Sequence, residues 1–380
     1  MNGPGPPTPL LVVASSAVAG GAERALASLV RFLPELGFAP HAALFERGPL
    51  EGWLADAGCP CHLVPFGRLR HPSDVARTVA ALRRLARRVD ARLVLDNLNT
   101  AHIYGGLAAA TLRLPAVWWQ QTIPGRRYGP LMTRPLLDTL AGRLPAEVVV
   151  ASSAEATAAQ RELTPRRRVE MVHLGIDLDA VRAATGRGAG LRAERGWGSE
   201  PIVGIAGWIW PWKGQDVFLR AAAELSKRWP TARFVVVGGT GEEAFRRRLD
   251  GLVAELGLAD RVTFTGARTD VYDWFDAMDV AVHASFGEPF GLVVVEAMAL
   301  GTPVVATSVG GPSEIVADGE SGLLVAPGDH RAMAAAVHRL LDDPALRARI
   351  GAAARARADH FSDRRMATEI GALLQAVLAR

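Results

Sequence analysis

The sequence predicts an α/β protein with two doubly wound parallel sheets. Short apolar runs alternate with amphipathic stretches along the chain, and this alternation is typical of parallel strands joined by crossover helices. The pattern restarts near residue 201, and a chain of 380 residues is long enough for two domains of ordinary size. Rossmann-like sheets of this kind bind ligands at the carboxyl ends of their strands, so we expect a cleft where the two domains face each other.

The first half of the chain carries one set of these elements. A helix is expected over 22–37, ending at Gly37, and a second over 74–90, where Val75, Val79 and Leu82 share one face. Six apolar runs predict strands, namely 10–15, 41–46, 61–66, 91–97, 115–121 and 146–153.

The second half repeats the arrangement after a polar, glycine-rich stretch, 184–201, which is the best candidate for a linker. Helices are expected from about Gln215 and over 242–257. Five apolar runs predict further strands, namely 201–207, 232–239, 261–267, 279–285 and 303–311.

Composition narrows the functional class. Hydrophobic residues make up 49% of the chain and charged residues 22%, which is close to the range of globular proteins. A formal charge of +4 is too balanced to require nucleic acid as a partner. The two cysteines, Cys59 and Cys61, are expected to be reduced, as in a cytoplasmic protein. No apolar run is long enough for a membrane-spanning helix, and the apolar start lacks the basic residues of a signal peptide.

The strongest chemical signal lies in residues 285–329, where Glu288 and Glu296 flank an expected helix start at Phe290, Gly291 and Leu292. Unpaired backbone amides at a helix start form an anion site, so this segment can hold a diphosphate. Glu296 would then lie two turns into the helix and accept from a ribose diol, while Glu288 outside the helix would accept from a sugar. The alternative is that both are surface carboxylates and that 292–295 is a buried strand, because consecutive valines favour strands.

This segment resembles the retaining glycosyltransferases of family 4, which have the two-domain GT-B fold. Their pattern is E-x-F-G-x4-E, then E-A-x-A-x-G-x-P-V, G-G-x-x-E and G-x-L-V-x-P-x-D. The matching residues are Glu288, Phe290, Gly291, Glu296, Ala297, Ala299, Gly301, Pro303, Val304, Gly310, Gly311, Glu314, Gly322, Leu324, Val325, Pro327 and Asp329. The resemblance also covers the G-G-x-E-R loop at 20–24 and a hinge segment at 173–181.

The resemblance implies an N-terminal acceptor-binding domain over 1–174, a nucleotide-sugar domain over 175–362, and a last helix at about 363–380 that crosses back to the first domain. It implies a retaining, metal-independent enzyme without a cofactor. Such an enzyme would move a hexosyl-type sugar from a nucleotide-diphosphate sugar, with UDP or GDP as the expected base carrier, to a hydroxyl of a saccharide, lipid-linked saccharide or natural product. The expected catalytic residues are Glu288 and Lys213. The expected donor-binding residues are Gly20, Gly21, Gly207, Trp208, Gly266, Arg268, Pro289, Phe290, Gly291, Leu292 and Glu296.

Lys213 is one of only two lysines in the chain and follows three tryptophans in the stretch GWIWPWKGQD. In the family, a Lys-Gly at this place directs its ammonium at the donor diphosphate. A compact charge on a flexible stem suits a leaving group that gains negative charge. Gln215 or Asp216 is expected to cap the following helix. The alternative is a solvated surface lysine.

Two positions depart from the family pattern. Trp208 stands where an arginine usually pairs with the lysine. The second positive charge must then come from elsewhere, such as Arg268 or Arg24, or the site binds the diphosphate with less charge. Gln120 and Gln121 stand near the usual place of a histidine, and glutamine cannot act as a general base.

Candidate acceptor-binding residues are Gln121, His102 and Trp210, although His102 equally suits a packing role or a helix start. Trp208, Trp210 and Trp212 would share a face if extended, which predicts either a stacking platform or a filled interface between the domains. The buried-strand candidates Trp118 and Trp119 would also suit an apolar acceptor.

Three alternatives remain at this stage. A degenerate member of the family would bind a sugar nucleotide or a partner without turnover, and an epimerase or hydrolase could use the same fold. A dehydrogenase is disfavoured because no G-x-G-x-x-G follows the first strand.

The basic helix 74–90 suggests peripheral membrane contact through Arg83, Arg84, Arg87 and Arg88, or merely a solvated face. No pattern of metal ligands is present in the sequence.

Overall fold

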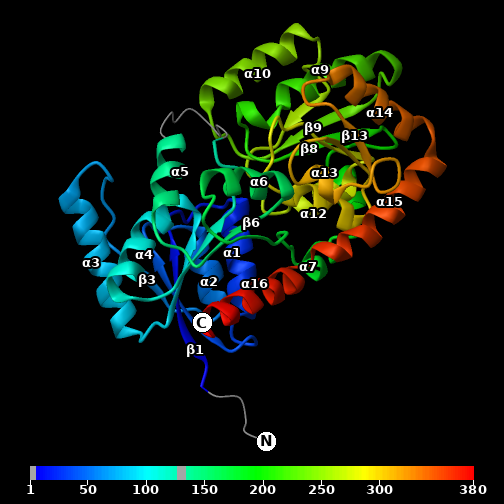
Figure 1. Cartoon of the computed structure of the whole chain (residues 1–380). Helices are drawn as coiled ribbons and strands as arrows, with labels where there is room; N and C mark the ends of the chain where they lie inside the picture. Colours follow the sequence, from blue (N-terminus) through cyan, green and yellow to red (C-terminus); the bar gives the residue numbers. More distant parts are fainter. Residues whose placement is uncertain (1–5, 126–133) are drawn as a thin grey trace, which may run out of the picture. The chain divides into compact units, whose positions relative to one another are not determined.

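The computed structural model describes residues 6–125 and 134–380, and the chain divides into two compact units. Within the described residues, unit 1 contains 6–125, 134–175 and 362–380, whereas unit 2 is the continuous stretch 176–361. Each unit has one parallel sheet with helices between its successive strands (Figure 1). The predicted α/β class with two doubly wound sheets is therefore confirmed.

Unit 1 is built on a seven-stranded parallel sheet with the order β3-β2-β1-β4-β5-β6-β7. The order reverses between β1 and β4, and ligands of doubly wound sheets bind at such a point. The strands are β1 (Thr8–Ala14), β2 (Phe38–Leu44), β3 (Cys61–Leu63), β4 (Leu93–Asn97), β5 (Ala116–Gln120), β6 (Val148–Ala151) and β7 (Val169–Met171).

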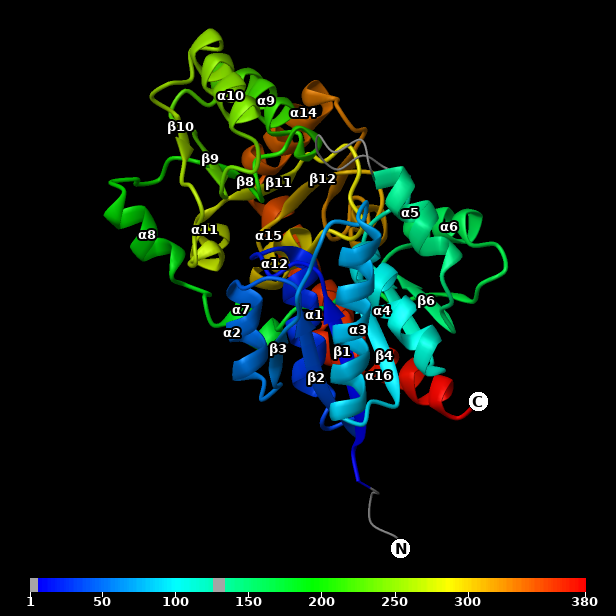
Figure 2. The same ribbon diagram turned by 90° about the vertical axis from the view of Figure 1, so that its left-hand side faces the viewer.

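The helices of unit 1 cover both faces of this sheet, and α3 and α4 lie in front of its strands in Figure 2. The helices are α1 (Gly21–Phe32), α2 (Pro49–Asp56), α3 (Pro72–Arg88), α4 (Leu98–Leu112), α5 (Arg134–Arg143), α6 (Ala154–Leu163) and α16 (Asp363–Leu378). The first helix ends at Phe32 rather than at the expected Gly37, because Pro34 has no N–H to continue the helical hydrogen bonds. Helix α4 is buried on most sides, so no amphipathic period marks it in the sequence.

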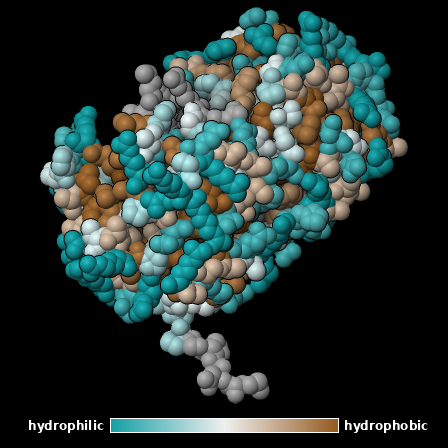
Figure 3. All heavy atoms as spheres, in the orientation of Figure 1, coloured by the Kyte–Doolittle hydropathy of each residue, from teal (hydrophilic) through white to brown (hydrophobic). Residues whose placement is uncertain are grey.

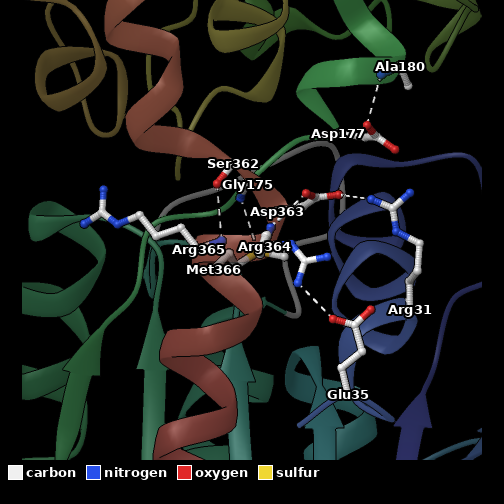
Figure 4. Close-up of polar contacts among 10 residues, drawn as sticks. All are labelled: Arg31, Glu35, Gly175, Asp177, Ala180, Ser362, Asp363, Arg364, Arg365 and Met366. Carbon is white, nitrogen blue, oxygen red and sulfur yellow. Dashed lines mark hydrogen bonds and ion pairs between the residues drawn. The ribbon is translucent and has the colours of Figure 1, made fainter.

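The last helix, α16, belongs to unit 1 and packs on α1 (Figure 4). Arg31 Nη2 lies 2.5 Å from Asp363 Oδ2, and Asp363 is almost fully buried. A second ion pair joins Arg364 to Glu35 at 2.8 Å. Where the chain leaves unit 1, a Cβ added to Gly175 would lie 2.3 Å from the carbonyl oxygen of Ser362. The two ends of unit 1 that lead into unit 2 are therefore in close backbone contact.

Unit 2 is built on a six-stranded parallel sheet with the order β10-β9-β8-β11-β12-β13. The strands are β8 (Ile202–Ala206), β9 (Arg233–Val237), β10 (Val262–Phe264), β11 (Val280–His283), β12 (Val304–Thr307) and β13 (Leu323–Val325). The helical segments are α7 (Leu178–Arg182), α8 (Gly188–Glu194), η1 (Pro211–Lys213), α9 (Gln215–Arg228), α10 (Glu243–Glu255), α11 (Val271–Ala277), α12 (Leu292–Leu300), α13 (Pro312–Ile315), α14 (His330–Asp342), α15 (Pro344–Ala358) and η2 (Asp359–Phe361).

The stretch 184–201 is not a linker, which corrects the expectation from its composition. Its helix α8 packs on α11 inside unit 2. Arg192 Nη2 donates to Asp279 Oδ2 at 2.7 Å, and the Gly188 amide donates to Asp276 Oδ2 at 2.7 Å. Glycine and charge here serve a tight packed turn, because a Cβ on Gly188 would collide with the backbone of Ala277.

The surface mixes hydrophilic and hydrophobic residues over the face drawn in Figure 3. Among the described residues, no helix combines the length and the apolar character that crossing a membrane requires. Cys59 and Cys61 are free thiols, as predicted. Burial raises the pKa of Cys59 to about 12, so this thiol is not a nucleophile at neutral pH.

Candidate functional site

Lys213 is placed by the segment that joins β8 to α9. The residue after it, Gly214, has a φ of +70°, and a Cβ there would lie 2.1 Å from the carbonyl oxygen of Ala284. Only glycine allows both this conformation and this close approach. The amide of Phe286 donates to the carbonyl of Trp212 at 2.9 Å. Two backbone contacts therefore hold the lysine segment against the loop that follows β11.

These backbone contacts bring together Lys213 and Glu288, the two residues expected to be catalytic. Their catalytic roles stay predictions. Lys213 Nζ lies 2.6 Å from Glu288 Oε2. The same oxygen accepts from Ser285 Oγ at 3.2 Å and lies 3.1 Å from His283 Nε2. Among the described residues, Glu288 Oε1 has no hydrogen-bond partner. One carboxylate oxygen is thus engaged by three donors, and the other is left for a ligand.

The charge state of Glu288 follows from these neighbours. Burial alone raises the pKa of this carboxyl, but the ammonium of Lys213 and the ring of His283 outweigh burial and lower its pKa to about 2. Glu288 is therefore an anion at neutral pH and can only accept hydrogen bonds. Lys213 also lies 4.2 Å from the ring centroid of Trp212, so the tryptophan face shares in holding the cation.

The segment 289–292 forms a helix start, as expected from its glutamate spacing, and residues 292–295 are helical rather than a strand. Gly291 is the N-cap with a φ of +102°, and no side chain caps the helix. The Phe290 ring is buried and packs on Phe361 at a centroid distance of 5.8 Å, so only its backbone can serve a ligand. Pro289 and Leu292 are half-buried beside it.

Glu296 is the fifth residue of α12, a little over one turn from the helix start and not two. It is buried, with 5% of its surface exposed. Its role at a ribose stays a prediction, as does diphosphate binding by the amides of Phe290, Gly291 and Leu292.

The three tryptophans do not continue as one extended run, because Trp212 lies in the short 3₁₀ helix η1. Trp208 and Trp210 lie against two glycines of the β9–α10 loop. A Cβ on Gly239 would lie 2.9 Å from the Trp208 ring, and a Cβ on Gly241 would lie 2.3 Å from the Trp210 ring. Trp208 is nevertheless 40% exposed, so part of its ring remains open to a ligand.

The cap predicted for α9 is wrong, because Gly214 is the N-cap and no side chain caps this helix. Gln215 is the first helical residue, and its Nε2 donates instead to the carbonyl of Trp208 at 3.0 Å. Asp216 follows it in the first turn of α9.

The expected donor-binding residues Gly266 and Arg268 lie on the exposed loop after β10. Gly266 accepts from the Gly238 amide at 3.1 Å, so this loop is joined to the end of β9. Arg268 forms a bidentate ion pair with Asp270, in which Nε donates to Oδ1 at 2.7 Å and Nη2 donates to Oδ2 at 2.6 Å. This partner lowers the pKa of the Asp270 carboxyl. Arg268 is therefore already neutralised in this structure.

In unit 1, the loop before α1 is organised by Glu23. Gly20 is the N-cap of α1 and Gly21 its first residue. A Cβ on Gly20 would lie 2.3 Å from Glu23 Oε2, so the absent side chain makes room for that carboxylate. Glu23 is 4% exposed, and burial raises its pKa. Gly20 thus makes room for the side chain of Glu23, and ligand binding by this loop stays a prediction.

Asp96 and His102 form a buried polar cluster near the carboxyl ends of the unit 1 strands. His102 is fully buried in α4, its Nδ1 lies 2.9 Å from Asp96 Oδ2, and its ring stacks on Trp118 at 4.7 Å. Burial raises the pKa of Asp96, against the opposing effect of His102. Trp118 and Trp119 are core residues, so neither offers a face to an acceptor in this structure. An acceptor contact by His102 stays a prediction.

Gln121 follows β5 and links two segments of unit 1. Its Nε2 donates to Asn97 Oδ1 at 2.6 Å and to the carbonyl of Ala22 at 3.2 Å. Its Oε1 is buried and has no partner among the described residues. Gln121 therefore ties the end of β4 to the start of α1 and keeps one acceptor oxygen unused.

Two residues of the Glu288 cluster were not expected from the sequence, namely His283 and Ser285. The available signal was that His283 interrupts the apolar run 280–284 and that Ser285 directly follows this run. Among the described residues, no group of three or more histidine, cysteine, aspartate or glutamate side chains gathers as a metal site.

Two family models match the chain. The model described as Glycosyltransferase Family 4 covers residues 19–180, and the model described as Glycosyl transferases group 1 covers residues 200–343. The first range lies almost wholly in unit 1 and the second in unit 2.

Similar proteins carry consistent names. A D-inositol 3-phosphate glycosyltransferase of Nocardia farcinica is 34% identical over 333 residues, which is 83% of this chain and 71% of that protein. The same enzyme of Streptomyces avermitilis is 43% identical over 205 residues, which is 52% of this chain but only 44% of that relative. The crystal structure of Anabaena HepE in complex with UDP and glucose matches with a TM-score of 0.86 and 28% identity, over 97% of this chain and all of that one.

Proposed function

The chain belongs to glycosyltransferase family 4, with the GT-B fold, and we propose that it is a retaining enzyme that transfers a hexosyl-type sugar from a nucleotide-diphosphate sugar to an acceptor hydroxyl. The observation that carries this proposal is the pairing of Lys213 with Glu288 Oε2 while Oε1 stays unengaged. The ammonium is the cation for the departing diphosphate, and Oε1 accepts from the donor sugar. Anabaena HepE, solved with UDP and glucose, supports UDP as the first carrier to test.

The proposed reaction follows from these positions. The acceptor oxygen forms a bond to the anomeric carbon, and the bond from that carbon to the diphosphate oxygen breaks. The acceptor proton passes to the departing phosphate, because Gln120 and Gln121 cannot take it. Lys213 and the amides at the start of α12 stabilise the negative charge that develops on the diphosphate. Glu288 stabilises the positive charge that develops on the sugar. No resident metal or cofactor is assigned in this proposal.

A thermal-shift panel with UDP, GDP, ADP and TDP tests the donor site. We expect one nucleotide to raise the melting temperature in a saturable way, with EDTA having no effect and with the shift lost in Lys213→Ala. Donor-dependent release of the nucleoside diphosphate then tests turnover. An unchanged shift in Lys213→Ala, or stabilisation that requires a divalent metal, would contradict the proposed site.

A second candidate is a non-catalytic protein that binds a sugar nucleotide, and Trp208 favours it. The family arginine expected there would add a second charge at the diphosphate, and Trp208 adds none. Arg268 does not replace that arginine in this structure, because Asp270 neutralises the charge of Arg268. Binding without release of nucleoside diphosphate, across a panel of saccharide and lipid-linked acceptors, would favour this candidate over the enzyme.

A further inference from the structure

His283 is the one imidazole among the described residues that contacts the carboxylate of Glu288. It is the last residue of β11, is 4% exposed, and places Nε2 at 3.1 Å from Glu288 Oε2. Strand β11 pairs with β12, and Thr307 at the end of β12 lies on the other side of the ring, with Oγ1 at 3.4 Å from Nδ1. The ring is therefore held between a carboxylate and a hydroxyl on the neighbouring strand.

The hydroxyl of Thr307 fixes the direction of this hydrogen-bond chain. Thr307 Oγ1 donates its only hydrogen to the carbonyl of Ser285 at 2.7 Å, so toward His283 it can only accept. Glu288 is ionised and can likewise only accept. A ring that carries hydrogens on both nitrogens satisfies both contacts, whereas either neutral tautomer loses one of them. His283 is thus arranged as a donor to Glu288.

The ammonium of Lys213 has two possible anionic partners, the carboxylate of Glu288 and the diphosphate of the donor. In this structure the ammonium pairs with Glu288, but in the proposed reaction it faces the diphosphate of the donor. When the ammonium turns to the phosphates, its hold on Oε2 weakens. The remaining donors to this oxygen are His283 Nε2 and Ser285 Oγ, and only the former is part of a ring that two strands hold in place.

We propose that His283 is a positioning residue, which keeps Glu288 Oε2 fixed when Lys213 engages the diphosphate, so that Oε1 stays directed at the donor sugar. This inference rests on the proposed function of Glu288 and Lys213. It separates two tasks within one cluster, because Lys213 serves the nucleotide part of the donor and His283 serves the sugar part through Glu288.

The separation predicts different effects on UDP and on UDP-glucose. His283→Leu removes the ring donor but retains an apolar side chain, so we expect UDP to bind within about twofold of wild type. Affinity for UDP-glucose, or kcat of transfer, should fall about tenfold or more, which is the scale of one hydrogen bond to a charged group. His283→Gln can donate from Nε2 and should recover most of this loss.

Calorimetric titration of both ligands into wild type, His283→Leu and His283→Gln provides the test. GDP and GDP-mannose replace the UDP pair if the nucleotide panel selects GDP. His338→Leu is the matched control, because His338 lies on α14 beside Asp342, away from Glu288, and should bind both ligands as wild type does.

Two outcomes would overturn the proposal for His283. One is an equal loss of UDP and UDP-glucose, which indicates only structural damage, and the other is unchanged binding and turnover of the sugar nucleotide. If His283→Leu does not fold, His283→Gln decides alone, because sugar-specific binding near the wild-type level supports the donor role and its absence overturns it. A wild-type chain that binds neither nucleotide nor sugar nucleotide refutes the proposed function itself, and the inference about His283 falls with it.

Discussion

Both units bury a carboxylate beside a histidine at the carboxyl edge of a parallel sheet, but the two pairs differ in charge. In unit 2, Glu288 has Lys213 as a third member, and its pKa is lowered to about 2. In unit 1, Asp96 has His102 and no cation at contact distance among the described residues, and burial raises its pKa. At Glu288 the ammonium of Lys213, together with His283, reverses the effect of burial. A buried carboxyl at this edge is therefore held as an anion where a cation accompanies it.

The largest effect is expected from Lys213→Met, which makes the unit 2 cluster resemble that of unit 1. Removing one partner of a buried ion pair leaves Glu288 without its cation, so we expect a loss of about 4 kcal/mol in the free energy of unfolding, together with loss of nucleotide binding. Urea unfolding at pH 7 measures the first quantity. Lys227→Met is the control, because among the described residues this exposed lysine pairs with Glu224 on the surface alone, and its removal should leave stability close to that of wild type.

The pH dependence of stability should have opposite signs at the two carboxylates. The folded pKa of Glu288 lies below its ordinary 4.5, so its contribution of about 3 kcal/mol is present above pH 4.5 and is lost as the pH falls toward 2. The folded pKa of Asp96 is raised, so protonating Asp96 relieves a cost as the pH falls.

Urea unfolding between pH 5 and pH 3 separates these contributions. Over this interval, wild type should lose about 2 kcal/mol more than Glu288→Gln. Asp96→Asn should instead lose more stability than wild type, because it lacks the relief that protonation of Asp96 provides. Parallel curves for wild type and Glu288→Gln would show that Glu288 is not held as an anion.

Gly214→Ala tests the backbone contact that creates the unit 2 cluster. A side chain there meets the Ala284 carbonyl as well as an unfavourable φ, so we expect a loss of about 3 kcal/mol and a weaker response to nucleotide. Gly257→Ala has a similar φ of +65° but open space around it, and should cost only about 1 kcal/mol. Equal costs for the two variants would mean that the contact with Ala284 contributes nothing.

The smallest effect is expected at Asp96 at neutral pH. Asp96→Asn keeps an oxygen that can accept from His102 and removes the cost of a buried charge, so stability at pH 7 should change by about 1 kcal/mol or less. Nucleotide stabilisation should be unchanged. A loss as large as that of Lys213→Met would show that Asp96 is a paired anion after all, and the contrast between the units would disappear.

Sequence patterns predicted most of the strands, because parallel strands buried on both faces are read directly as apolar runs. They missed β7 and β13, which are three-residue strands at the sheet edges. The family resemblance selected Lys213 and Glu288 as catalytic candidates, and the structure brings the two side chains into contact. Sequence patterns did not reveal α4, which has no polar face, nor the packing of 184–201, whose glycine and charge satisfy tertiary contacts of Gly188 and Arg192.

The partners of the two carboxylates were harder to predict for a different reason. His283 is a lone polar residue at a strand end, and only the register of β11 beside β12 shows that Thr307 orients its ring. Asp96 is accommodated by Gly105, where a Cβ would lie 1.8 Å from Asp96 Oδ1. Such contacts depend on which elements become neighbours in space, and the spacing of residues along the sequence does not indicate which elements these are.

The attachment of α16 to unit 1 has a consequence for the order in which the protein is made. Unit 2 is one continuous stretch, so all of its strands leave the ribosome before α16 does. Arg31 of α1 and Glu35 beyond its end cannot pair with Asp363 and Arg364 during that whole interval. All residues of unit 2 are therefore synthesised before the helix that completes unit 1.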